Sequence, residues 1–301
     1  MNDIRVHAPT SLLFLCGGQI RIEENPAPSL RDAFARFAME PPFSKYNVLI
    51  AEDLNAFFPS GAYRDLLLFE SDIAQISELI LVFSESYGSA AELGAFCMVT
   101  EISQRLLVVI DSENYNEKSF VALGPLRFLQ NQHGDEAVCV LNLKDMNLTS
   151  IRNVSTLDVR SFRKSMELAI KSRKSIPKER TSFDKSRPGH IIKLIVGIIQ
   201  HYGALTLEEV SVHISVVRND LDDEVIKNYL LCAEFAGWVR KEKRGISTFY
   251  VSITEKPAFN YSFRAGVTPM DKTRWQLDIR EYWKENDPIR FGVIADAIGG
   301  I

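Results

Sequence analysis

Long apolar runs are missing from this chain, and none reaches the roughly 18 to 20 residues that a membrane-spanning helix needs. Its start, MNDIRVHAPT, lacks the charged-then-apolar order of a signal peptide. We therefore expect a cytoplasmic protein with no membrane partner. The 301 residues, 46% of them hydrophobic, suffice for one large or two medium globular domains.

Cysteine and histidine are also scarce. The cysteines show neither paired metal spacing nor the framework of a disulfide-stapled domain, so we expect them to be reduced and mostly buried: Cys16, Cys97, Cys139 and Cys232. The five histidines form no HxxxH or HxH pattern, which argues against a zinc site. The sequence predicts neither a metal ion nor a cofactor.

Positive charge is concentrated in one segment. The formal net charge is −4, yet residues 160–187 hold ten basic and three acidic residues, a net charge of +7 that leaves −11 for the remainder. A basic block in an otherwise acidic protein indicates a polyanionic partner. A solvated linker is the alternative interpretation, because residues 176–188 carry charges, serines and two prolines.

Short apolar runs alternate with helix-like segments in the first half of the chain. Continuous apolar strands separated by helices are typical of a parallel sheet covered on both faces. The sequence therefore predicts an α/β, Rossmann-like domain. The expected strands are residues 12–16, 48–51, 79–83, 106–110 and 137–141, and the expected helices are 29–39 with Ser29 as N-cap, 63–77 and 156–173.

The loops that follow the strands are the expected ligand site, because ligands of open α/β sheets bind beyond the carboxyl ends of the strands. These loops are residues 16–19, 52–55, 84–88 and 111–114. Three of the four contain an acidic residue, which is unlike a pocket for bare phosphate. Gly17 and Gly18 would nevertheless let backbone N–H groups approach a substrate.

The segment SESYGSAAELGAF, residues 84–96, places one carboxylate, Glu92, behind a glycine turn that closes strand 79–83. We expect a helix that begins near Ser89, with Glu92 in its first turn. Free backbone N–H groups and the helix dipole stabilise an anion there. Glu92 is therefore a candidate nucleophile. The alternative is a glutamate that only satisfies the dipole.

Short helices replace the strand pattern beyond residue 187. Three helices followed by a β-hairpin predict a winged helix-turn-helix. The helices are residues 191–201, 206–214 with a capping box of Thr206 and Glu209, and 223–235, and the hairpin spans 238–252. We thus expect a catalytic domain (1–150), a basic helix and linker (151–187), a winged helix-turn-helix (188–255) and an aromatic tail (256–301). The tail, with a helix over 275–285, should pack on the body or on a partner.

Residues 69–96 resemble the nucleoside 2-deoxyribosyltransferase family. The elements that carry the resemblance are Asp72, strand 79–83, Gly88, and Glu92 followed by Leu93 and Gly94. The first strand with Gly17 and Gly18 is similar to the family's first substrate loop, and the resemblance covers about residues 10–145. It implies an N-glycosidase in which Glu92 attacks the anomeric carbon of a sugar and Asp72 contacts the leaving base.

One departure from that family concerns the leaving group. The family has a further aspartate six residues before the nucleophile, where this chain has Ser86 beside Glu85. An ordinary base needs protonation as it leaves, whereas the nicotinamide of NAD is already cationic. A carboxylate that stabilises an oxocarbenium ion or forms a glycosyl intermediate therefore suits NAD as substrate. Ser86, Tyr87 and Gly88 would line the site, with Tyr87 stacked on the base or nicotinamide, or else part of a polar loop.

Nucleic-acid contacts are predicted for the basic helix and for the hairpin wing. The third helix would place Lys227 and Asn228 in a groove, but acidic residues at 220 and 222–224 repel a polyanion. Backbone contact is therefore favoured over sequence reading. The residues expected to meet phosphate are Arg163, Lys164, Lys171, Arg173, Lys174, Arg240, Lys241, Lys243 and Arg244.

A glycosidase-like domain joined by a basic linker to a winged helix resembles the effector proteins of bacterial retrons. This resemblance spans nearly the whole chain. It implies a toxic effector of anti-phage defence that hydrolyses NAD to nicotinamide and ADP-ribose. The implied partners are a reverse transcriptase and its hybrid of RNA and multicopy single-stranded DNA, and a homo-oligomer would let subunits complete each other's pockets.

Two other hypotheses remain open at this point. One is a deoxyribosyltransferase or nucleoside hydrolase of nucleotide salvage, which leaves the winged helix unexplained. The other is a transcription regulator whose first domain senses a nucleotide without turnover.

Overall fold

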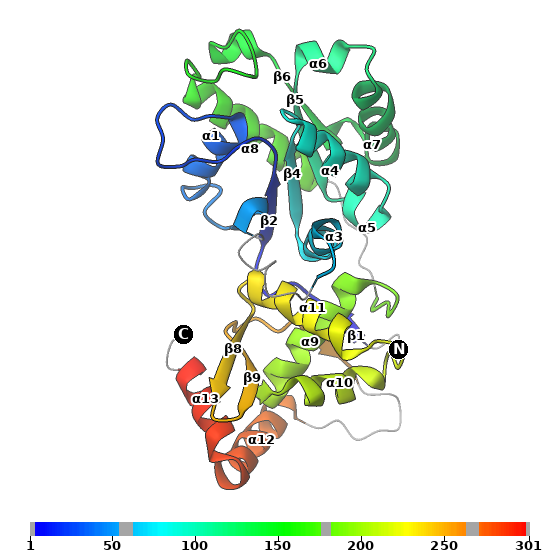
Figure 1. Ribbon diagram of the computed structural model, residues 1–301, viewed down its shortest axis with the longest axis vertical. Helices are drawn as coiled ribbons and strands as arrows, with labels where there is room; N and C mark the ends of the chain where they lie inside the picture. The colour runs from blue at the N-terminus through cyan, green and yellow to red at the C-terminus, as the bar shows by residue number, and fades with distance from the viewer. Residues whose placement is uncertain (1–3, 54–62, 176–181, 263–270, 299–301) are drawn as a thin grey trace. The chain divides into compact units, whose positions relative to one another are not determined.

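The computed structural model describes residues 4–53, 63–175, 182–262 and 271–298 (Figure 1). The chain forms two compact units that do not follow its linear order. The sheet unit comprises residues 11–53 and 77–179, and the C-terminal unit comprises residues 1–10, 54–76 and 180–301. Residues 1–10 and 54–76 were expected in the catalytic domain but belong to the C-terminal unit. The basic helix, expected between the two domains, belongs to the sheet unit.

A five-stranded parallel sheet forms the centre of the sheet unit, in the order β3-β2-β4-β5-β6. Every residue of β2, β4 and β5 is buried, as expected for strands covered on both faces. The protein is thus of the mixed α/β class, and the strand predictions are confirmed to within one residue. The strands are β2 (Leu12–Cys16), β3 (Asn47–Ile50), β4 (Leu79–Phe83), β5 (Leu106–Asp111) and β6 (Val138–Leu141).

Helices cover the two faces of this sheet (Figure 1). On one face, α1 (Leu30–Ala38) and α8 (Val159–Ser175) bury Phe34 and Phe162 against the strands. On the other lies α4 (Tyr87–Cys97), whose Phe96 meets Phe14 of β2 at a ring-centroid distance of 6.4 Å. The remaining helices are α5 (Thr100–Ser103), α6 (Ser112–Asn116) and α7 (Arg127–His133), with short helical turns at Ala51–Asp53, Ala122–Leu126, Asp135–Ala137 and Leu143–Met146.

The first residues of α1 and α4 determine at which helical turn the candidate residues lie. Ser29 is the N-cap of α1, as predicted, because its hydroxyl accepts a hydrogen bond from the Asp32 N–H. Helix α4 begins at Tyr87 rather than near Ser89, because Ser86 and Ser89 form a reciprocal capping box. Glu92 consequently lies in the second turn of α4, and the first-turn prediction is wrong.

Within the C-terminal unit, residues 188–252 form three helices and a three-stranded antiparallel sheet in the order β7-β9-β8. The capping box of Thr206 and Glu209 and the hairpin are present as predicted. The helices are α9 (Pro188–Tyr202), α10 (Leu207–Ser215) and α11 (Asp223–Phe235), and the strands are β7 (Ala204–Leu205), β8 (Val239–Arg244) and β9 (Ser247–Ser252).

Two segments from the first part of the sequence complete this unit. Strand β1 (Ile4–Val6) pairs antiparallel with β10 (Phe259–Tyr261). Helix α3 (Leu66–Ile76) packs on α9 and α11. A Cβ at Gly189 of α9 would lie 2.8 Å from the Gln75 carbonyl oxygen, so α3 and α9 approach each other very closely.

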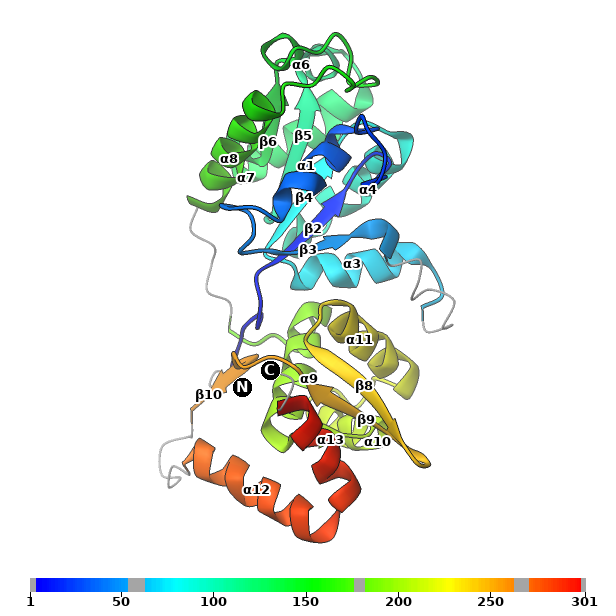
Figure 2. The same cartoon turned by 90° about the vertical axis from the view of Figure 1, so that its left-hand side faces the viewer.

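The aromatic tail folds back on the same unit as α12 (Lys272–Asn286) and α13 (Pro288–Ile298), beside α9 and β9 (Figure 2). The Trp283 indole donates to the Tyr202 carbonyl oxygen at 2.9 Å. The buried Arg290 guanidinium donates to the Glu209 carboxylate at 2.7 Å and stacks over the Trp283 ring. Among the described residues, no helix has both the length and the apolar character to cross a membrane.

Candidate active site

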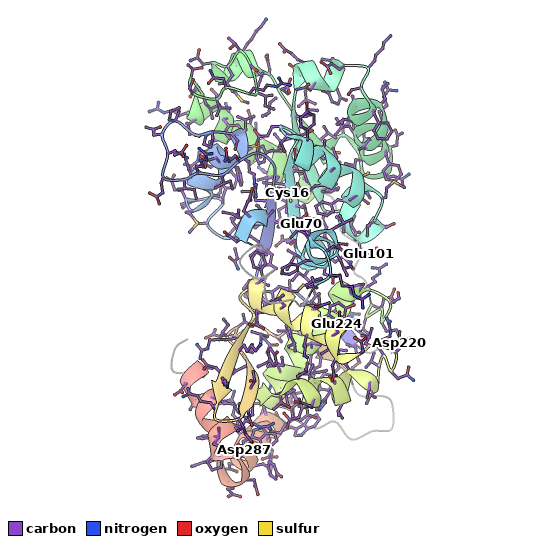
Figure 3. The ribbon with its side chains drawn as sticks, viewed as in Figure 1. Cys16, Glu70, Glu101, Asp220, Glu224 and Asp287 are labelled. Carbon is purple, nitrogen blue, oxygen red and sulfur yellow. The ribbon has the colours of Figure 1, made fainter. Side chains whose placement is uncertain are left out.

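The candidate site lies at the carboxyl edge of the parallel sheet, where β2 ends at Cys16 (Figure 3). Gly17 follows with a φ of +152°, and a Cβ there would lie 2.8 Å from the Cβ of Phe83. A Cβ at Gly18 would lie 2.8 Å from Oε1 of Glu85. Both glycines are therefore required by close packing at this turn, independently of any substrate.

Glu85 fastens this turn to the start of α1. Its carboxylate accepts hydrogen bonds from the backbone N–H groups of Gly18 at 3.0 Å, Leu30 at 2.9 Å and Arg31 at 3.1 Å. Two of these donors belong to the first turn of α1, where N–H groups have no partner within the helix. Burial raises the pKa of Glu85, whereas the three N–H donors and the Arg31 charge lower it. The Gly18 N–H that was expected to face substrate is thus already bound.

Arg31 and Glu52 form a bidentate ion pair at the same edge. The Arg31 side chain is 1% exposed and donates to the two oxygens of Glu52 at 2.6 and 2.5 Å. It also donates to the carbonyl oxygens of Leu15 at 2.6 Å and Gly18 at 3.1 Å. The pair therefore fixes the glycine turn and places a positive charge beside the site.

Glu92 of α4 is partly buried and interacts with the Cys16 thiol and the charges of Arg31 and Glu52. Burial raises the pKa of its carboxyl group, and the Glu52 charge adds to that rise. The Arg31 charge and a hydrogen bond from the Cys16 thiol lower it. Its Oε2 atom is buried and has no hydrogen-bond partner among the described residues. Desolvation, rather than a helix dipole, is therefore the main influence on the pKa of the Glu92 carboxyl group.

The other residues predicted to line the site follow β4 directly. Ser86 caps α4, so its hydroxyl is bonded to the Ser89 N–H and hydroxyl. Tyr87 is 96% exposed, and a Cβ at Gly88 would meet only the Ser86 hydroxyl, at 3.7 Å. The start of α4 thus offers an accessible aromatic ring next to open space.

The structure adds residues that the sequence analysis missed. Arg31 was not singled out, and its only signal was a cation directly after Leu30 at the start of a predicted buried helix. Glu52 and Asp53 lay in an expected ligand loop but received no role. The pKa of Asp53 is raised by burial and by the Glu52 charge, against the opposing charge of Arg31. The described residues contain no cluster of His, Cys, Asp and Glu suited to a metal ion.

Asp72 belongs to the C-terminal unit, whereas Glu92 belongs to the sheet unit. It lies inside α3, within the helix that the sequence predicted over residues 63–77. Its carboxylate is 4% exposed and accepts a hydrogen bond from the Tyr63 hydroxyl at 2.9 Å. The same hydroxyl lies 3.0 Å from the sulfur of Cys232. Burial raises the pKa of Asp72 to about 6, although the Tyr63 hydrogen bond opposes the rise. These contacts hold α3 against α11.

Comparison with known protein families adds an independent observation. The model of the STM3845 retron effector protein family matches residues 27–241. The chain belongs to this family. The matched range includes Arg31, Glu52, Glu85 and Glu92 of the effector's candidate site but not Gly17 or Gly18, and it ends within β8 of the C-terminal unit.

Two relatives from Escherichia coli share parts of this effector. The "Retron Ec86 putative ribosyltransferase/DNA-binding protein" is 28% identical over 173 residues, which are 54% of this chain and 51% of the relative. The "Retron Ec73 putative ribosyltransferase/DNA-binding protein" is 35% identical over 68 residues, 23% of this chain and 22% of the relative. The similarity thus spans about half the length of the first relative and less of the second.

Three basic residues of α8 that were predicted to bind nucleic acid are engaged within the effector's sheet unit. Arg163 pairs with Glu40 at 2.5 Å, and Lys174 pairs with Glu78 at 2.6 Å. Arg173 is 4% exposed and donates to the carbonyl oxygens of Leu106 at 2.7 Å and Gln104 at 2.8 Å. Burial thus keeps Arg173 from a polyanion, whereas nucleic-acid contact by Arg163 and Lys174 stays a prediction, because their ion pairs are partly exposed.

The remaining predicted cations are accessible. Lys164 and Lys171 are exposed on α8, and Lys241 and Lys243 are exposed on β8. Arg240 pairs with Glu242, and Arg244 pairs with Asp296. Acidic Asp220 and Glu224 lie before and within the first turn of α11, as the sequence indicated (Figure 3). Exposed cations therefore occur on both units.

Proposed function

We propose that this effector is a toxic N-glycosidase of a retron anti-phage defence system, cleaving the nicotinamide–ribose bond of NAD or of a related nucleotide. The observation that carries the proposal is Glu92: its carboxyl group is partly buried beside Arg31, with one buried oxygen lacking a partner. A desolvated carboxylate interacts strongly with a cation that develops next to it. The sugar of a glycosidic substrate develops such a charge at its anomeric carbon.

The reaction breaks the bond between the anomeric carbon and the nicotinamide nitrogen. The bonding electron pair leaves with nicotinamide, which becomes neutral. Glu92 either stabilises the resulting oxocarbenium ion or bonds to its anomeric carbon. Water then supplies a hydroxyl group to that carbon and releases one proton, which yields ADP-ribose.

The polar residues that precede Glu92 are already hydrogen-bonded, which favours a cationic leaving group. Ser86 caps α4, and Glu85 is bonded to three backbone N–H groups, so neither is placed as a free proton donor. Nicotinamide needs no such donor, unlike a neutral purine or pyrimidine. In this proposal Tyr87 stacks on the nicotinamide or adenine ring. Gly17 and Gly18 shape the turn beneath the substrate.

A second candidate is cleavage of an ordinary nucleoside or deoxynucleoside, as in nucleotide salvage. Asp53 supports it, because its raised pKa is the property that a proton donor to a leaving base requires. The two candidates differ in their dependence on this residue. Asp53→Asn should abolish release of a neutral base but leave release of nicotinamide from NAD unchanged.

We further propose how the units divide the work. The sheet unit would be a Rossmann-like, deoxyribosyltransferase-like catalytic domain, and α9 to α11 with the β8–β9 hairpin would be a winged helix-turn-helix. Lys241 and Lys243 on β8 and Lys164 and Lys171 on α8 would contact nucleic-acid backbone. The expected partners are the retron reverse transcriptase and its hybrid of RNA and multicopy single-stranded DNA, in the cytoplasm. Asp72 has no catalytic role in this proposal.

The test is nicotinamide release from NAD by the purified chain, followed by chromatography. We expect Glu92→Gln to lower the rate by about 100-fold or more, as is typical when a main electrostatic contact of the transition state is removed. Glu117→Gln is the matched control, because Glu117 is an exposed glutamate at the C-cap of α6 in the same unit and lies outside the loops expected to bind ligand. It should retain the parent rate.

Equal rates in the parent and Glu92→Gln would show that Glu92 has no part in the reaction. Loss of growth inhibition in cells that produce Glu92→Gln, with retention in cells that produce Glu117→Gln, would link the reaction to toxicity.

A further inference from the structure

A cavity lies within the C-terminal unit and is not used by the proposed reaction. It has a volume of about 610 Å³, within the range of small-molecule sites. Residues of α9, β9, β10, α12 and α13 line it. The lining side chains that matter for its chemistry are Gln200, His201, Tyr261, Lys272, Gln276 and Arg280.

One side of the cavity is aromatic. The His201 ring lies 4.4 Å from the Trp275 ring and 6.5 Å from the Tyr261 ring, measured between centroids. Phe259, which also lines the cavity, stacks with Tyr261 at 5.5 Å. Gly197 allows this arrangement, because a Cβ there would lie 1.8 Å from the Phe259 ring. The rings of His201, Phe259 and Tyr261 form a wall against which a planar base can pack, and Trp275 contacts His201 without lining the cavity.

His201 provides an unused polar atom in this wall. The residue is 9% exposed, and its Nε2 atom is buried with no hydrogen-bond partner among the described residues. Burial and the Lys272 charge both lower the pKa of the imidazole, which favours its neutral form. A neutral imidazole can donate or accept a hydrogen bond, so it can pair with a polar edge of a base.

Positive charge also lines the cavity, beside the aromatic wall: the Lys272 ammonium lies 3.9 Å from the centroid of the Tyr261 ring. Lys272 donates to the Tyr261 carbonyl oxygen at 2.7 Å, and two further N–H groups of its ammonium remain. Arg280 lies two turns further along α12 and is exposed. Glu255 is the one carboxylate among the described residues that line the cavity, so cations outnumber anions there.

We propose that this cavity binds a phosphorylated nucleoside unit. The base packs against His201 and Phe259, and the phosphate meets Lys272 and Arg280. The unit is either a free 5′-nucleotide or the end of a single-stranded nucleic acid, since both present the same base and phosphate. This site is separate from Glu92 and does not depend on NAD cleavage.

Photo-crosslinking of the full chain tests the proposal. The probes are 5-iodo-dUMP and a 5′-phosphorylated hexathymidylate that carries 5-iodo-dU at its first position. Binding is measured by titration, and cross-linked peptides are identified by mass spectrometry. We expect cross-links in residues 257–261, which include four residues of the cavity lining. Arg280→Gln should weaken binding by about fivefold or more, because it removes a charge-assisted phosphate contact.

Arg274→Gln is the matched control, because Arg274 is an exposed arginine of the same helix that does not line the cavity. It should bind as the parent does. Tight binding of 5-iodo-dUMP would identify a free nucleotide as the ligand, and binding of the hexamer alone would identify a strand end. Absence of binding, equal weakening by both substitutions, or cross-links confined to other segments would overturn the proposal. A Glu92→Gln background separates the two sites, because it leaves this cavity unchanged.

Discussion

At the scale of the residue, the two acids singled out by the sequence have different environments. Glu92 is partly buried with one oxygen unpaired, whereas Asp72 is bonded to Tyr63 within the C-terminal unit. The pKa of each is raised mainly by burial. Desolvation therefore does not by itself identify a catalytic carboxylate. An unsatisfied oxygen at the carboxyl edge of a sheet is the more specific sign.

The contacts of Asp72 predict a pH-dependent stability. The pKa of Asp72 is about 6 in the folded protein, whereas the ordinary value of 3.8 applies to the unfolded chain. The folded state therefore binds the proton more tightly. The resulting stabilisation is complete below the unfolded pKa and is lost as the pH rises through about 6, at a cost of about 3 kcal/mol. Asp72→Asn should remove this component, and the free energy of unfolding in urea at pH 4 and pH 7 measures it.

Asp278→Asn is the control for that experiment, since Asp278 is exposed on α12. At pH 7 we expect Asp72→Asn to be at least as stable as the parent and to retain NAD cleavage. A selective loss of NAD cleavage in a stably folded Asp72→Asn protein would instead restore the catalytic role that the sequence suggested.

At the scale of the element, features that depend on neighbouring residues in the sequence were predicted most accurately. The caps at Ser29 and Thr206 and all five parallel strands could be predicted, because each depends on neighbours in the sequence. The start of α4 was misplaced by two residues, because serines at 86 and 89 are both plausible caps and only the structure shows their reciprocal bonding. That shift moved Glu92 out of the first turn.

The glycine contacts yield a prediction at this scale. Gly197→Ala should destabilise the C-terminal unit by about 1 to 3 kcal/mol, the usual cost of overpacking. The added methyl group would overlap the Phe259 ring and displace β10. Thermal or urea unfolding measures the change.

Gly292→Ala provides the matched comparison. Gly292 lies in α13 of the same unit, and its Cβ would meet no atom within 4 Å. Replacing a helical glycine by alanine there should stabilise the protein by up to about 1 kcal/mol. Similar effects of the two substitutions would mean that Phe259 does not pack on Gly197.

At the scale of the whole molecule, the division of the chain could not be read from the sequence. Residues 63–76 look like one more helix of the alternating pattern, yet α3 packs with α9 and α11. Arg31 and Glu52 escaped notice for a similar reason, because their pairing joins residues 21 positions apart. Such long-range contacts produce no periodic pattern of residues in the sequence. Composition likewise could not show that Arg173 is buried.

The two-unit organisation predicts how fragments behave. A fragment of residues 182–298 should fold poorly, because it lacks α3 and β1. Placing residues 63–76 before residue 182 through a glycine–serine linker should restore a cooperative thermal transition. A scrambled 63–76 sequence on the same linker is the control. Equal transitions in the bare and the fused fragments would show that α3 is dispensable.

The pairing of β1 with β10 also has a consequence during translation. All residues of the sheet unit precede residue 180, so they leave the ribosome before most of the C-terminal unit has been made. At roughly 5 to 20 residues per second, β1 waits on the order of tens of seconds for its partner strand. A nascent chain can therefore complete the carboxylate site while the unit proposed to bind nucleic acid is still unfinished. Any inhibition of the carboxylate site that requires the C-terminal unit can therefore begin only once that unit has been synthesised.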